Sequence, residues 1–201
     1  MAEFIKHIDD ALLWNRFRSG DEHAYTELAR RYYRTLVQYG QRFTPNMQVI
    51  EDTIQDLLVH LWLHRASIND TASVKFYLIK SFRHRMIKTI KPLCDEIELT
   101  DQCHSVSFES SREELWIQGE NDLALKKQVR NVLEQLPSRQ QEVIYLRFFQ
   151  NLMPEEIALL LSINPQSVSN IIQRALTNLR GLWQSIPSFT VLFYSFCQTL
   201  S

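Results

Sequence analysis

Polar side chains able to hydrogen-bond recur at helical spacing in the segment NPQSVSNIIQRALTNLR, residues 164–180. The set consists of Gln166, Ser167, Asn170 and Arg174. Short amides and hydroxyls can approach base edges in the major groove, and an arginine one turn further on can reach a base or a phosphate. Residues three and four apart share a helix face, so the set would point one way. The apolar residues that would pack inward are Val168, Ile171, Ile172 and Ala175.

The start of this helix is clearly marked, because Asn164 is a favourable N-cap and Pro165 suits the first helical position. A shorter helix is predicted before it, PEEIALLL at 154–161, with proline at its start and acids in its first turn. Two helices joined by a three-residue turn have the form of a helix-turn-helix unit, whose second helix enters the major groove. An ordinary helical hairpin with a solvated polar face stays open as the alternative.

A second polar set lies in the segment IEDTIQDLLVHLW, residues 50–62. Asp52, Gln55 and Asp56 are three and four residues apart and therefore share a helix face. Two carboxylates and an amide on a rigid helix suit a basic partner surface through charge-assisted hydrogen bonds. An acidic face that is merely solvated is the alternative. The apolar stripe of the same helix consists of Ile50, Ile54, Leu57, Leu58, Leu61 and Trp62.

A basic segment and an acidic segment follow one another in the middle of the chain. Residues 75–91 contain six lysines and arginines together with His84, and no acid. Cations at that density suit phosphate contacts, and Phe76 or Tyr77 could stack on an unpaired base. In residues 92–122 nine acids stand against one arginine, and helical periodicity lapses. The pattern predicts a basic helix followed by an acidic linker.

The elements that position these sets are predicted to be helices throughout. With four glycines and six prolines in 201 residues, the chain has few of the tight turns that a sheet-rich fold requires. Apolar residues recur every three or four positions in the remaining segments, as they do along one face of a helix. One helix is predicted at 4–17. A second is predicted around Ala24, Leu28, Tyr32 and Leu36, with Asp21 as its cap, and a third around Leu78, Phe82, Met86 and Ile90. Two more are predicted at 123–136 and 138–150, the latter capped by Ser138.

The predicted fold class is therefore all-α, with two small helical domains joined by an acidic linker. The first domain would cover residues 1–91, the linker 92–122 and the second domain 123–182. An apolar tail, 183–201, would follow, with aromatic residues on one side of a helix. That stripe would pack on the protein's own domain or, alternatively, contact a partner.

Composition excludes several classes of protein. A formal net charge of −1 and a pI of about 6.6 argue against a polycation that coats nucleic acid. The three cysteines lack C-x-x-C spacing, which favours reduced thiols. Neither a signal peptide nor an apolar run of the ~20 residues that span a bilayer is evident. We expect a soluble, cytoplasmic protein with no direct membrane insertion.

Nothing in the sequence indicates catalysis. His60 and His64 are four residues apart, but no third possible metal ligand follows at a spacing typical of a zinc site. We therefore interpret them as an exposed pair. Phosphate-binding loops and nucleophile motifs are also missing. We expect no enzyme, no cofactor and no metal site.

The second half of the chain resembles region 4 of bacterial sigma factors of the sigma-70 family, extracytoplasmic-function type. The first half is similar to region 2 of the same family: GDEHAYTELARRYYRTL and IEDTIQDLLVHLW resemble its first two helices, with Ile50 in place of the usual alanine and Leu58 in place of the usual phenylalanine. The resemblance covers roughly residues 10–182, apart from the linker. The region 4 matches are Leu136-Pro137, Arg139, Val143, Leu146-Arg147, Glu156-Ile157-Ala158, Val168, Arg174-Ala175-Leu176 and Leu179-Arg180.

The resemblance implies an alternative sigma factor that binds core RNA polymerase and directs promoter-specific transcription initiation, with an anti-sigma factor as a further partner. It implies that Asp52, Gln55 and Asp56 dock on the largest polymerase subunit, and that the loop 66–73 holds a flipped base of the −10 element. Recognition of the −35 element would fall to Gln166, Ser167, Asn170 and Arg174. Recognition and melting of the −10 element would fall to Asn69, Asp70, Tyr77, Lys80, Arg83, His84 and Lys88.

The resemblance is incomplete at the −10 positions, because His84 replaces the usual asparagine and Lys88 the usual aspartate. Two other functions therefore stay in competition. A conventional dimeric helix-turn-helix regulator would bind a palindrome without polymerase. A sigma-like interaction protein would bind polymerase and read no promoter.

Overall fold

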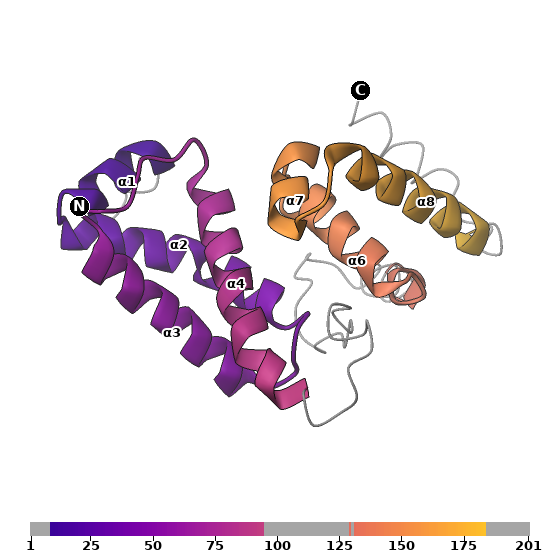
Figure 1. Cartoon of the computed structure of the whole chain (residues 1–201), viewed down its shortest axis with the longest axis horizontal. Coiled ribbons are helices and arrows are strands. Elements are labelled where there is room, and N and C mark those ends of the chain that lie inside the picture. The colour runs from indigo at the N-terminus through magenta and orange to yellow at the C-terminus, as the bar shows by residue number, and fades with distance from the viewer. Residues whose placement is uncertain (1–8, 95–128, 130, 184–201) are drawn as a thin grey trace, which may run out of the picture. The chain divides into compact units, whose positions relative to one another are not determined.

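The computed structural model describes residues 9–94, 129 and 131–183 of the chain (Figure 1). Every regular element in these residues is a helix, which confirms the predicted all-α class. Contacts divide the chain into two compact units, Met1–Ser111 and Arg112–Ser201. Most of the predicted linker, 95–122, and the tail beyond residue 183 lie outside the described residues.

The described residues of the N-terminal unit, 9–94, form a bundle of four helices. They are α1 (Asp10–Arg18), α2 (Glu22–Gly40), α3 (Met47–His64) and α4 (Val74–Cys94). The long helix α2 contacts the other three, and α4 also contacts α1 and α3. The predicted stripes form its core, because Leu28, Leu36, Ile54, Phe82 and Met86 are all buried.

Local hydrogen bonds explain where these helices begin. Asp21 caps α2 as predicted, since its Oδ1 accepts from the backbone N–H groups of His23 and Ala24. The Ala24 N–H is the largest influence on this carboxyl and holds the pKa of Asp21 below its ordinary value. Asn46, which the sequence pattern did not single out, caps α3 in the same way by accepting from Gln48 and Val49.

Two predicted helix bounds are wrong. The first helix does not run continuously from Phe4, because Asp9 is extended, with φ −60° and ψ 142°, and α1 begins at Asp10. Residues 4–8 lie outside the described part of the chain. The basic helix continues past residue 91 and includes Pro92 before it ends at Cys94.

Three helices meet at Gly40, the last residue of α2. A Cβ atom on this glycine would lie 2.6 Å from Cγ2 of Ile50 and 3.1 Å from Cζ of Phe82. Both side chains are fully buried, and Ile50 belongs to α3 while Phe82 belongs to α4. The missing side chain therefore allows α3 and α4 to approach the end of α2 closely.

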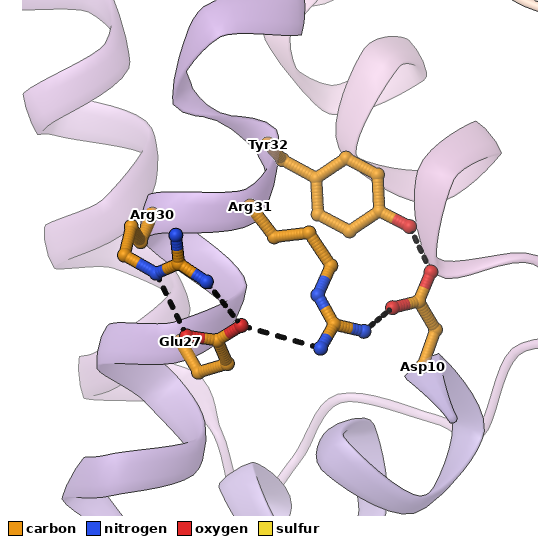
Figure 2. Close-up of polar contacts among 5 residues, drawn as sticks. All are labelled: Asp10, Glu27, Arg30, Arg31 and Tyr32. Carbon is orange, nitrogen blue, oxygen red and sulfur yellow. Dashed lines mark hydrogen bonds and ion pairs between the residues drawn. The ribbon is translucent and has the colours of Figure 1, made fainter. Parts of the chain in front are cut away.

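A network of ion pairs joins α1 to α2 (Figure 2). Arg31 lies at its centre, with Nη1 2.6 Å from Oδ1 of Asp10 and Nη2 3.2 Å from Oε1 of Glu27. Arg30 donates to both carboxylate oxygens of Glu27, at 2.9 and 2.8 Å, and the Tyr32 hydroxyl donates to Asp10. Burial, and then Asp10, raise the pKa of Tyr32, which keeps the phenol protonated as the donor.

The C-terminal unit contains α6 (Ser138–Ile144), the π-helix η3 (Tyr145–Phe149), α7 (Pro154–Leu161) and α8 (Pro165–Trp183). Residues 131–134, also helical, precede them. Contacts join α6 to α8, α7 to α8 and η3 to both α6 and α7. One cluster of the core consists of Val132, Leu136, Ile144, Ala175 and Leu179.

The prediction that Ser138 caps its helix is wrong. Pro137 is the capping residue, with φ −55° and ψ 141°, and no side chain forms the cap. Its carbonyl accepts from the N–H groups of Gln140 and Gln141, at 2.8 and 3.1 Å, so Ser138 is already the first helical residue. The expected single helix from 138 to 150 also changes to a π-helix at Tyr145.

We predict that Gly40→Ala lowers the free energy of unfolding of the N-terminal unit by about 1–3 kcal/mol, because the new methyl group overpacks the core against Ile50. Gly181→Ala is the matched control. That glycine is also helical and nothing lies within 4 Å of its added Cβ, so the change should stabilise the protein by up to about 1 kcal/mol. Denaturant titration measures both, and equal effects of the two changes would contradict the close approach.

We predict a pH-dependent effect for Glu27→Gln. The hydrogen bond from Arg30 is the largest influence on this carboxyl and holds the pKa of Glu27 below its ordinary 4.5, although burial acts in the opposite direction. Its contribution to stability is complete above pH 4.5 and is lost as the pH falls through the lowered pKa. At pH 7 the substitution should cost about 1–3 kcal/mol of unfolding free energy.

Denaturant titrations between pH 7 and 3 measure this effect. The difference between the wild type and Glu27→Gln should shrink towards pH 3, and a difference that does not change with pH would contradict the role of the network. Glu22→Gln removes an exposed carboxylate from the same helix and should change stability by less than about 0.5 kcal/mol.

Candidate functional site

The predicted helix-turn-helix unit is present in the C-terminal unit (Figure 1). Helix α7 has the predicted bounds, and α8 begins at Pro165 as predicted but continues past Arg180 to Trp183. At the start of α7 the backbone N–H of Met153 donates to Oε2 of Glu156, 2.8 Å away. Ser162 ends α7 in the left-handed conformation, with φ 54° and ψ 44°. Asn164 then caps α8, since its Oδ1 accepts from the N–H of Ser167 at 2.6 Å. A side-chain hydrogen bond thus marks the start of each helix, and the left-handed residue Ser162 begins the turn between them.

One face of α8 is polar and exposed. Gln166, Asn170 and Arg174 are exposed, whereas Ser167 is half-buried. Nε2 of Gln166 donates to Oδ1 of Asn170 at 3.2 Å, so the two amides are oriented together and the Asn170 amide group keeps its own donors. Gln173, exposed on the same face, was not part of the predicted set, although its spacing of three from Asn170 could have indicated it.

The opposite face of α8 anchors the helix. Val168 and Ala175 are fully buried, and Ile171 and Ile172 are half-buried, as the apolar spacing predicted. The polar face is therefore held towards solvent by the packing of the apolar one.

Arginines of the region 4 pattern brace the helix-turn-helix unit from outside it. Nη2 of Arg139 donates to the carbonyl of Leu161 at the end of α7, 3.2 Å away. Nη1 of Arg147 donates to the carbonyl of Leu152, 3.1 Å away, in the segment that leads into α7. One contact thus lies at the end of α7 and the other just before its start, and together they hold α7 in position.

The acidic set on α3 is displayed as predicted. Asp52, Gln55 and Asp56 are all exposed, while the opposite stripe of Ile50, Ile54, Leu57 and Leu61 is buried. The side-chain amide of Gln48 donates to Oδ1 of Asp52 at 2.8 Å. This partner is a neutral amide, so the carboxylates of the face can still receive cationic groups.

Two apolar side chains continue this face and were missed by the sequence analysis. Val59 is 51% exposed and Leu63 is 68% exposed. Val59 follows Asp52, and Leu63 follows Asp56, by seven residues or about two helical turns, which places all four on one side of α3. The signal was available, because both are apolar residues away from the buried stripe. The α3 face, as we call Asp52, Gln55, Asp56, Val59 and Leu63, thus combines charge with apolar area.

The basic helix α4 presents a cationic face. Lys80, His84 and Lys88 are exposed at spacings of four, and Tyr77 lies half-buried on the same side. Arg83, three residues after Lys80, is half-buried. Nζ of Lys80 lies 5.7 Å from the ring centroid of Phe76, within the range of a cation–π contact.

The loop between α3 and α4 carries the other two residues of the predicted −10 set. Asn69 and Asp70 are both exposed, and Oδ1 of Asp70 accepts from the N–H of Thr71 at 2.9 Å. Trp14 of α1 brings the loop and α4 together, because it donates to the Asn69 carbonyl and its ring lies 5.0 Å from that of Tyr77. Trp14 therefore contacts both the loop backbone and the ring of Tyr77.

His60 and His64 are exposed, with ring centroids 4.1 Å apart. Partial burial, then the charge of Arg85 and the neighbouring imidazole, lower the pKa of His60. Among the residues that the structure describes, no group of three or more histidines, cysteines or acids is placed to hold a metal ion.

This architecture is that of a DNA-binding protein with a second helical module. Family models for sigma-70 region 2 and sigma-70 region 4 match residues 28–91 and 126–179, which together make up more than half of the chain. The chain therefore belongs to the sigma-70 family of RNA polymerase sigma factors and is of the extracytoplasmic-function type. Sigma factors of this type bind core RNA polymerase and promoter DNA, and they direct transcription initiation without being enzymes.

Individual relatives agree with the family assignment. The chain is 25% identical over 158 residues to the RNA polymerase sigma factor YlaC of Bacillus subtilis, covering 77% of this chain and 88% of YlaC. It is 24% identical over 189 residues to the ECF RNA polymerase sigma-E factor of Escherichia coli K12, covering 85% of this chain and 92% of that one.

A solved structure shares the fold. CnrH, determined in complex with the cytosolic domain of CnrY, superimposes with a TM-score of 0.58 and 20% identity, covering 88% of this chain and 98% of CnrH. Across the described ranges, none of the helices combines the length and apolar character needed to cross a membrane.

Proposed function

We propose that this sigma factor has three separate binding surfaces, each on a different helix. The α3 face binds core polymerase, the cationic face of α4 with the loop 66–73 binds the −10 element, and the polar face of α8 reads the −35 element. The observation that carries the proposal is the segregation of charge: Asp52 and Asp56 are exposed on α3, whereas Lys80 and Lys88 are exposed on α4 of the same bundle.

The α3 face suits a protein rather than DNA. Asp52 and Asp56 would repel phosphates, whereas they would attract lysines and arginines on polymerase. Val59 and Leu63 add apolar area that a protein surface can bury. Gln55 lies between the two carboxylates in sequence and supplies both a donor and an acceptor.

The cationic face of α4 suits single-stranded promoter DNA. Lys80 and Lys88 would contact phosphates, and His84 between them adds a ring that can stack or donate. Asn69 and Asp70 present an amide and a carboxylate able to bond the edge of an unpaired base. Tyr77 and Arg83 complete the proposed set. Trapping an unstacked base costs a few kcal/mol, so melting would require polymerase.

The polar face of α8 suits duplex DNA. Gln166 and Asn170 would reach base edges, Ser167 at the capped N-terminus would contact a phosphate or a base, and Arg174 would reach either. Asn164 would place these residues at the helix end that enters the groove.

The wider setting also belongs to the proposal. The domains would be 1–91, an acidic linker at 92–122, 123–182 and a tail at 183–201, in a protein of the cytoplasm. An anti-sigma factor would bind it, and support comes from CnrH, whose structure contains the cytosolic domain of CnrY.

In vitro transcription with purified core polymerase and a library of genomic fragments tests the proposal. Start sites that appear only when the chain is added, and that share two motifs near −35 and −10, are expected. Tight binding to core polymerase without any start sites would contradict promoter reading by α4 and α8.

We predict that Asp56→Arg abolishes association with core polymerase while the fold is retained, because it places a cation in a face proposed to meet cations. Co-sedimentation or interferometry with core polymerase measures the association, and circular dichroism checks the fold. Glu22→Arg changes the net charge equally at an exposed site on α2 and should leave association unchanged. Equal losses from both changes would indicate a general charge effect.

We predict that Asn170→Ala spares polymerase association and weakens binding of the holoenzyme to −35 duplex DNA by about 1–3 kcal/mol, the value of one base contact. Fluorescence anisotropy with promoter duplexes from the start-site mapping measures the change. Asn131→Ala is the control, since it removes an exposed asparagine of the same unit away from α8. Loss of polymerase binding through Asn170→Ala would contradict this division of work.

A further inference from the structure

The first helix of the bundle lies outside the family match, yet it contacts elements inside that match. Helix α1 precedes residue 28, where the match to region 2 begins. It nevertheless contacts α4 as well as α2, and two of its side chains reach the loop between α3 and α4.

Those two side chains hold adjacent carbonyl groups of the loop. Nε of Arg18 donates to the carbonyl of Ile68 at 2.8 Å, and Nε1 of Trp14 donates to the carbonyl of Asn69 at 3.4 Å. The Ile68 side chain is itself 92% buried, so the loop is anchored at this point by packing as well. The side chains that follow, on Asn69 and Asp70, stay exposed.

The turn before α2 places α1 where it can make these contacts. Gly20 has φ +93°, a conformation that glycine adopts without strain, and the N–H of Asp21 bonds back to the carbonyl of Arg16. Arg16 adds an ion pair with Asp21 across the same turn, at 2.6 Å, but this pair is partly exposed and contributes little, because the backbone bond of the turn does not need the Arg16 side chain. Arg16 thus faces the turn, while Arg18, two residues later, reaches the loop.

Trp14 also connects the loop to α4. Its side chain is 99% buried, its indole N–H bonds the Asn69 carbonyl, and its ring lies edge-on to Tyr77 with 5.0 Å between centroids. The loop backbone and the aromatic residue on the cationic face of α4 are therefore supported by one rigid indole.

We propose that Trp14 and Arg18 are positioning residues for promoter opening, because they hold the backbone of the loop 66–73 in the shape that receives an unpaired base. The proposal rests on the assignment of this loop to the −10 element. Neither residue has to touch DNA. In an anchored loop, Asn69 and Asp70 are in place before the base arrives. The loop then loses less conformational entropy when it binds the base.

A direct phosphate contact by Arg18 is the competing explanation, and it makes different predictions. Loss of a phosphate contact would weaken binding at every sequence and reduce the slope of log Kd against log salt concentration by about 1. Loss of a loop anchor would weaken binding only where the loop meets a base, and it would leave the salt slope unchanged.

The test uses holoenzyme containing Arg18→Met, Trp14→Phe or the control Arg16→Met. The probe is a promoter from the start-site mapping, with a duplex −35 region and a single-stranded −10 region, in which each −10 base in turn is replaced by an abasic sugar. The ratio of Kd for abasic and natural probe measures base capture. For the wild type we expect about tenfold or more at one or more positions.

Arg18→Met and Trp14→Phe should each reduce that ratio at least ~3-fold. The affinities for core polymerase and for the abasic probe, and the salt dependence of binding, should stay unchanged. Arg16→Met should keep the wild-type ratio. Wild-type ratios in both variants would overturn the proposal, as would a uniform loss with a shallower salt slope. Loss of polymerase binding in both would overturn it too, by showing that the contacts sustain the whole bundle. If the wild type itself shows no sensitive position, the assignment of the loop to the −10 element fails instead.

Discussion

The close approach of three helices at Gly40 is the constraint on which the N-terminal unit depends. Ile50 of α3 and Phe82 of α4 occupy the space that a side chain on α2 would need. This packing sets the directions of α3 and α4, and with them the directions of an acidic face and a cationic face. Because a packed core transmits small displacements rather than absorbing them, one methyl group at this point would disturb both surfaces.

Fold and recognition are assigned to different residues in the C-terminal unit. Arg139 and Arg147, which contribute to the family resemblance, donate to backbone carbonyls around α7, and Asn164 caps α8. The residues proposed to read DNA, such as Gln166 and Asn170, make few contacts with the rest of the unit beyond their own helix. A rigid scaffold with an exposed reading face can change its DNA preference at little cost in stability.

Local signals made much of this structure predictable. The cap at Asp21, the bounds of α7, the start of α8 and the buried stripe of α3 followed from capping chemistry and from the 3.6-residue period, both of which act within a few positions. The errors lay where two local signals competed. Serine at 138 is a good cap in general, yet Pro137 took that position because its extended backbone already ends the preceding segment. The π-helix at Tyr145 has no periodic signature of its own.

The sequence by itself determined the helices, their faces, the segregation of acidic and basic residues and the family. Helical periodicity and capping need only neighbouring residues, so they can be recognised without a fold. Only the tertiary structure decided that Arg18 and Trp14 hold a loop 50 and 55 positions away, and that Val59 and Leu63 stay uncovered. Such contacts depend on how the turn at Gly20 places one helix against others, and no local pattern specifies that distance.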